Sequence, residues 1–211
     1  MVEKIELKIR TLVNHFRRRP LNYFTESDIH SYLYLAFYRD KLFSGQYPTL
    51  NPVEKTVLVH REYPTFFKYD NQPPIVPSDK ARSRGHYDLV ILNPEFVKAN
   101  RLDVVTNKEY SFMLKKPVII PLIAAIEFKF IIGQINEHML KNIKLDFQKL
   151  THTKPYSYSR YFLLFNRFGP IGENFGELER MREDNVDVKA VYAEAFYEGN
   201  EKKHKEIYWF D

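Results

Sequence analysis

Three residues carry side chains that could bind a metal and act on a phosphate: Asp88, Glu127 and Lys129. Asp88 interrupts an apolar run, and Glu127 lies within the most hydrophobic stretch of the chain, residues 118–130. In a strand, Glu127 and Lys129 point to one face, whereas Phe128 between them points to the other. A carboxylate that is buried without a partner is strongly destabilising, so these acidic groups require a cation nearby.

Two cations satisfy this requirement, the Lys129 ammonium and a divalent metal. Carboxylates of Asp88 and Glu127 on adjacent strands would hold Mg²⁺, or Mn²⁺ in its place, and leave room for water and a phosphate oxygen. The metal would polarise the phosphate, and Lys129 would orient or deprotonate the attacking water. The alternative is structural: Glu127 and Lys129 form a same-face salt bridge, and Asp88 caps a strand end.

Hydrophobic periodicity predicts the elements that position these residues. Apolar side chains at helical spacing predict an N-terminal helix over residues 1–19 and a second over residues 26–41, which Thr25 and Asp28 open as a capping box. A third helix is expected after Gly133, with an apolar stripe formed by Leu140, Ile143, Phe147 and Leu150. β-branched and apolar runs predict strands at residues 56–63, 87–92, 118–130, 161–165, 186–196 and 205–210.

This order of elements predicts an α/β fold with a central mixed β-sheet flanked by helices. We expect a single domain over residues 1–211, with its core at about 25–168 and additional C-terminal strands at 186–210. The charged, mixed segment 95–116 is interpreted as an insertion outside the sheet.

The spacing of the residues and elements resembles the PD-(D/E)XK nuclease superfamily, whose core is called restriction-endonuclease-like. Its hallmark is a helix bearing Glu, a strand bearing Asp, a strand bearing Glu-x-Lys, and then a helix and a strand. The matching segments are residues 25–29, 85–91, 124–129 and 146–150, with Tyr87 at the nominal proline position. The resemblance implies that Asp88 and Glu127 are metal ligands and that Lys129 is the catalytic lysine.

The resemblance implies further roles around this centre. The Phe128 carbonyl would add a backbone metal ligand, and Glu26 would complete the site from the helix. Asp28 competes with Glu26 but is interpreted as the capping residue, and the structural alternative for Glu26 is a favourable charge at a helix start. Gln148 and Lys149 occupy the crossover helix, where the superfamily places a site-facing polar residue. Their structural alternative is a solvated helix face.

The charge balance is compatible with a nucleic-acid partner but does not require one. The formal net charge is +5, which fits a polyanion. Arg82 and Arg84 precede the Asp88 strand in a predicted loop, and residues 17–19 form a second basic cluster. Such side chains, with Lys149, would contact phosphates without reading base sequence. DNA is the expected substrate rather than RNA, and the superfamily resemblance implies a homodimer.

The chain has no cysteine, which excludes disulfides, zinc–cysteinate sites and a thiol nucleophile. Together with its 15 tyrosines, this resembles small proteins of archaeal viruses or thermophilic archaea. The N-terminus has no signal-peptide core, and the longest apolar stretch, residues 117–126, is half of what a membrane helix needs. We therefore expect no membrane span and an intracellular protein, in the cytoplasm or in a host's cytoplasm, that is not secreted.

The function predicted from the sequence is a Mg²⁺-dependent nuclease, either endonuclease or exonuclease, that hydrolyses phosphodiester bonds. One alternative is a nucleic-acid-binding or assembly protein that keeps the nuclease fold without turnover. A second is a structural protein in which Glu127 and Lys129 form only an ion pair.

Overall fold

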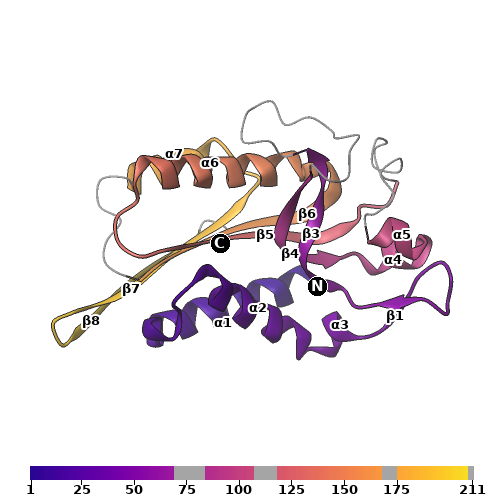
Figure 1. The fold of residues 1–211 in the computed structure, drawn as a ribbon, viewed down its shortest axis with the longest axis horizontal. Helices are drawn as coiled ribbons and strands as arrows, with labels where there is room; N and C mark the ends of the chain where they lie inside the picture. Colours follow the sequence, from indigo (N-terminus) through magenta and orange to yellow (C-terminus); the bar gives the residue numbers. More distant parts are fainter. Residues whose placement is uncertain (69–83, 107–117, 168–174, 209–211) are drawn as a thin grey trace. The chain divides into compact units, whose positions relative to one another are not determined.

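The computed structural model describes residues 1–68, 84–106, 118–167 and 175–208. These residues form an α/β fold with a six-stranded mixed sheet in the order β3-β4-β5-β6-β7-β8 (Figure 1). Neighbouring strands are antiparallel in β3/β4, β4/β5 and β7/β8, and parallel in β6/β7. The strands are β3 Val59–Lys68, β4 Arg84–Leu92, β5 Leu122–Ile131, β6 Ser157–Asn166, β7 Lys189–Glu198 and β8 Glu201–Tyr208. The predicted α/β class with a mixed sheet is confirmed.

Three of the described helices match those predicted from apolar periodicity, and the other described helices were not predicted. The described helices are α1 Val2–Arg18, α2 Glu26–Tyr38, α3 Lys41–Ser44, α4 Pro94–Ala99, α5 Leu102–Val105, α6 Glu137–His152 and α7 Phe175–Glu183. Short 3-10 turns lie at Pro20–Asn22 and Lys154–Tyr156, and a small sheet pairs β1 Tyr47–Pro48 with β2 Lys55–Thr56. The sequence did not predict α7, because Leu178 is its one buried residue and forms no apolar stripe.

The chain divides into two compact units. The first comprises residues 1–33, 127–151 and 161–211, and the second comprises residues 34–126 and 152–160. The division falls within α2, after Leu33, and within β5, after Ile126. The C-terminal part of β5, which contains Glu127 and Lys129, therefore belongs to the first unit.

The first unit is built in three layers, with α1 and α2 on one face of its strands and α6 and α7 on the other (Figure 1). Phe165 of β6 faces α1, where its ring centroid lies 5.1 Å from that of Phe16. Phe162 faces α6, where its centroid lies 4.5 Å from that of Phe147. Side chains that alternate along a strand of this unit thus reach different helix pairs.

In the second unit, the end of α5 contacts β3. Tyr63 of β3 donates its hydroxyl hydrogen bond to the Val105 carbonyl at the end of α5, over 2.7 Å. Asn93 caps α4 by accepting from the Glu95 N–H at 3.0 Å. Among the β4/β5 pairs, Leu89 lies opposite Ile126, which fixes the register of the two strands within this unit.

Each strand of the six-stranded sheet differs from its predicted range at one or both ends, and prolines explain two of these differences. β5 begins at Leu122 rather than at Val118, which is fully exposed, because Pro121 has no N–H for the ladder. β3 continues through Pro64, which is tolerated because β3 lies at one end of the order of described strands. Arg84, which we expected in a loop, is the first residue of β4.

The predicted capping box at the start of α2 is confirmed. The Asp28 carboxylate accepts hydrogen bonds from the N–H groups of Phe24 and Thr25, at 2.8 and 2.9 Å. The Asp28 N–H in turn donates to the Thr25 hydroxyl at 3.3 Å. The backbone hydrogen bonds from Phe24 and Thr25 lower the pKa of Asp28 from its ordinary value.

Replacing Asp28 with alanine is expected to lower the free energy of unfolding by about 0.5–2 kcal/mol at neutral pH, the usual effect of losing a helix cap. A group whose pKa is lowered in the folded state contributes stability at pH values above its unfolded pKa. That contribution is lost as the pH falls through the folded pKa. The difference between parent and variant should therefore shrink in acid. Urea unfolding over a pH series measures it, with Asp28→Asn, which keeps a capping oxygen, as control. A difference that persists undiminished in strong acid would contradict this account.

Candidate functional site

Five charged side chains of the first unit gather between β5, α6 and the start of α2. We call them the charged cluster: Glu26, Glu127, Lys129, Asp146 and Lys149. Glu26 opens α2, Glu127 and Lys129 lie on β5, and Asp146 and Lys149 lie on α6. Segments separated by about a hundred residues thus contribute to one constellation.

The strand alternation that the sequence predicted governs the cluster. The Phe128 ring lies on the α2 side, 5.3 Å from the centroid of His30. Glu127 and Lys129, on either side of Phe128, instead reach α6, where their partners are Lys149 and Asp146 respectively. The prediction that Phe128 points away from Glu127 and Lys129 is confirmed.

The inner part of the cluster is an ion pair shielded from water. The Lys149 ammonium lies 2.6 Å from Glu127 Oε2 and 3.4 Å from Asp146 Oδ1. The side chains of Glu127 and Lys149 are only 1% and 7% exposed. Because burial penalises an isolated carboxylate heavily, Lys149 supplies the positive charge that Glu127 requires in this position.

The outer part of the cluster is open to solvent. The Lys129 ammonium lies 3.0 Å from Asp146 Oδ2 and 3.9 Å from Glu26 Oε1, and the Lys129 side chain is 27% exposed. Glu26 also accepts a hydrogen bond from the Phe130 N–H, 3.2 Å from its Oε2. Lys129 is therefore a cation of the cluster that a dissolved substrate can reach, whereas Lys149 is enclosed.

The apolar stripe of α6 explains why Asp146 and Lys149 turn inward. Ile143, Phe147 and Leu150 are buried, and Asp146 lies three residues after Ile143 on the same side of the helix. Lys149, three residues after Asp146, adjoins that stripe and is buried with it. The helix thus carries one acidic and one basic side chain toward β5 as it packs.

The cluster brings together four residues that the sequence singled out, Glu26, Glu127, Lys129 and Lys149. Lys149, which we expected to contact DNA phosphates, lies in the interior against Glu127, because α6 buries that side of the helix. Gln148, its neighbour on α6, is partly buried. Asp146 was not predicted as a site residue, although its helical spacing from Ile143 and Leu150 could have revealed it.

Asp88 lies in the second unit, within β4, and is partly buried. Its neighbour Leu89 pairs with Ile126, the residue before Glu127. Glu62 of β3 lies between Arg61, which pairs with Leu89, and Tyr63, which pairs with Tyr87. The backbone of Glu62 has a left-handed φ of 49°. Such strain in a non-glycine residue often accompanies functional sites. The position of Asp88 relative to the charged cluster stays a prediction.

Two further residues, Arg82 and Arg84, were predicted to contact DNA phosphates. Arg82 lies outside the described residues, and Arg84 begins β4. Within the described ranges, no group of three or more His, Asp and Glu side chains is arranged to hold a metal ion. The two lysines of the cluster lie between its carboxylates instead. In the same ranges, no helix is long and apolar enough to cross a membrane.

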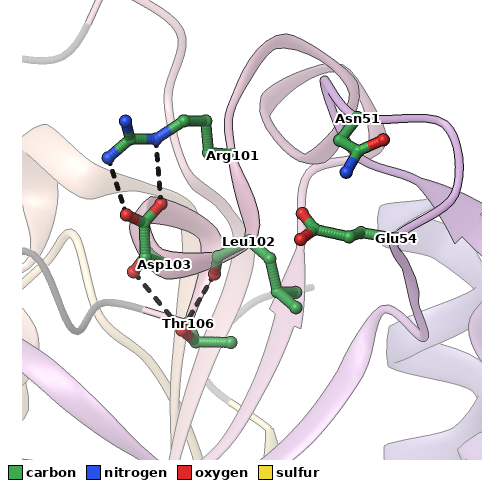
Figure 2. A pocket seen from close by; sticks show the side chains of 6 residues that line it. All are labelled: Asn51, Glu54, Arg101, Leu102, Asp103 and Thr106. Carbon is green, nitrogen blue, oxygen red and sulfur yellow. Dashed lines mark hydrogen bonds and ion pairs between the residues drawn. The ribbon is translucent and has the colours of Figure 1, made fainter.

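A pocket of about 450 Å³ opens in the second unit (Figure 2). Its lining comprises Asn51, Glu54, Arg101, Leu102, Asp103 and Thr106. Arg101 donates two hydrogen bonds to the Asp103 carboxylate, at 3.2 and 2.6 Å, and this pairing lowers the pKa of Asp103. These two charges therefore neutralise each other, and the six lining residues include none of those predicted from the sequence.

No protein-family model, curated protein or solved structure matches the chain.

Proposed function

We propose that the protein is a Mg²⁺-dependent nuclease that hydrolyses phosphodiester bonds, with DNA as its substrate. The observation that carries the proposal is the charged cluster. A buried Glu127 and a solvent-accessible Lys129 share one face of β5, and the Lys129 ammonium lies 3.9 Å from Glu26. This set of residues is also where the sequence resembles the PD-(D/E)XK superfamily, so we propose a restriction-endonuclease-like core.

Mg²⁺ fits the donor chemistry of these residues. Lysine ammonium groups lie between the carboxylates of the charged cluster. Mg²⁺ prefers oxygen ligands, which Glu127, Asp88 and the Phe128 carbonyl would provide. The cluster contains three carboxylates and two ammonium groups, so its formal charge of −1 favours an added cation. A bound Mg²⁺ would supply Lewis acidity and a more acidic water.

The protein's own groups account for the rest of the reaction. Lys129 would hold the attacking water and stabilise the negative charge that develops on the phosphate oxygens. The water oxygen forms the new bond to phosphorus, one ester P–O bond breaks, and the leaving oxygen takes up a proton. Asp146 and Glu26 would orient Lys129, because both carboxylates lie within 4 Å of its ammonium.

A nucleic-acid-binding or assembly protein without turnover is the second candidate. The contact between Lys149 and Glu127 favours it, because a buried carboxylate that already has an ammonium at 2.6 Å needs no metal for stability. This candidate and the nuclease differ in their response to divalent ions. The homodimer remains part of the proposal and is tested by the mass of the protein in solution.

Millimolar Mn²⁺ or Mg²⁺ is expected to raise the melting temperature of the protein, because the metal binds only the folded chain. A concentration about a hundredfold above Kd would add about 2.7 kcal/mol to the free energy of unfolding. Differential scanning calorimetry with each ion and with EDTA measures this. Glu127→Gln should abolish most of the increase, whereas Glu177→Gln, a change on the surface of α7, should keep it. A melting temperature indifferent to Mn²⁺ would favour the binding protein.

A further inference from the structure

A basic surface forms where the C-terminal end of α1 meets β8. Lys202 of β8 donates to the Arg18 carbonyl at 3.1 Å, and Arg17 lies 2.7 Å from Glu206. The two segments are more than 180 residues apart in the chain but lie side by side (Figure 1). We define the basic surface by the residues on this side of β8 and in the last turn of α1: Arg17, Arg18, Arg19, Lys202, His204 and Glu206.

Strand alternation decides which β8 residues belong to this surface. Lys202 and Glu206 both contact α1, so His204 between them lies on the same side. Lys205 points to the other side, where its ammonium lies 4.3 Å from the centroid of Phe175 on α7. With His204 neutral, the basic surface carries four positive charges and one negative, and its net charge of +3 is a large part of the chain's +5.

Two structural explanations account for only part of this charge. Basic residues at the end of a helix offset its dipole, but that dipole amounts to about half a negative charge, far less than the excess of three. Lysines on the last strand in the described order also discourage pairing with another sheet. This second explanation covers Lys202 but not Arg18 and Arg19, which lie at the end of a helix.

We propose that the basic surface binds the phosphate backbone of DNA, as a contact separate from the charged cluster. Arg18, Arg19 and Lys202 are exposed, and their charges are spread over two elements, as contacts to successive phosphates require. Pairing with a second copy along β8 is disfavoured, because the lysines of both strands would repel each other. The choice of DNA as the partner rests on the proposed nuclease function. Phosphate binding by the basic surface does not, since binding can be measured without cleavage.

The test compares two variants of the full chain that lose the same charge. The first combines Arg18→Gln, Arg19→Gln and Lys202→Gln, and the matched control combines Arg39→Gln, Lys55→Gln and Lys98→Gln at exposed positions of the second unit. Affinity for a short fluorescent DNA duplex of mixed sequence is measured in EDTA over a salt series. Thermal melting confirms that each variant is folded.

The first variant should bind the duplex at least about tenfold more weakly at moderate salt, and its salt dependence should be smaller by about 2–3 in the slope of log K against log salt. The control should bind within about twofold of the parent. Equal losses in both variants would overturn the proposal in favour of net charge alone. An unchanged affinity in the first variant would also overturn it.

The affinities of the parent for single-stranded DNA and for RNA of the same length are compared with its affinity for the duplex. This comparison shows which kind of nucleic acid the basic surface binds. A membrane is the alternative partner. If the parent binds phosphatidylglycerol vesicles but not duplex DNA, and the first variant loses vesicle binding, the surface belongs to a membrane and the proposal is overturned. A protein that binds through this surface but never cleaves DNA would leave the inference intact while the nuclease proposal fails.

Discussion

Replacing Lys129 with alanine is expected to slow DNA cleavage by about two orders of magnitude or more, the scale of one acid–base or electrostatic group. Lys129 is suited to this role because its ammonium is held by Asp146 at 3.0 Å and yet is 27% exposed. The loss should appear in kcat rather than KM, since Lys129 acts on charge that develops during the reaction.

DNA affinity should change little in this variant, because Lys129 is one of 32 Lys and Arg residues that contribute to the attraction of phosphates. Lys144→Ala removes an exposed lysine of α6 and serves as the matched control. Cleavage of branched and linear DNA is measured with Mg²⁺, with Mn²⁺ and with EDTA. If Lys129→Ala and Glu127→Ala both cleave at the parent rate, the charged cluster is not the catalytic site.

Replacing Lys149 with methionine is expected to lower the free energy of unfolding by about 3–5 kcal/mol, the usual cost of removing one partner from a buried ion pair. The change leaves Glu127 buried without the ammonium that lies 2.6 Å from it. Methionine keeps most of the volume of the lysine stem, so the loss reports on charge rather than on packing. Urea unfolding of parent and variant measures it.

The double variant Glu127→Gln with Lys149→Met should be less destabilised than Lys149→Met alone, because no charge remains buried at position 127. Lys144→Met, an exposed change on the same helix, should be close to neutral. If Lys149→Met is also close to neutral, the buried ion pair contributes nothing to stability.

The same variant separates a metal site from a structural ion pair. If Glu127 is a metal ligand, the Lys149 ammonium competes with the metal for its carboxylate. Mn²⁺ should then stabilise Lys149→Met more than the parent, because the ion replaces the missing positive charge. A variant that is destabilised but unaffected by Mn²⁺ would identify the cluster as structural.

Local patterns in the sequence determined the strands of the main sheet, the three long helices and part of the cluster. Alternation along a strand has a fixed period of two, so the spacing of Glu127 and Lys129 placed them on one face and Phe128 on the other. The capping box depends on residues three apart, so Thr25 and Asp28 could be paired without knowledge of the fold. The helix after Gly133 was equally visible, because its apolar residues recur at helical spacing.

Only the tertiary structure decided which partners these residues meet. Asp146 and Lys149 lie on α6 at the margin of its apolar stripe, and a polar residue there faces water or the interior according to how the helix rotates against β5. The basic surface likewise joins Arg18 to Lys202, which are distant in sequence and adjacent only because β8 lies beside α1. Periodicity reports the face of an element, but contacts between elements depend on their packing, which no local pattern encodes.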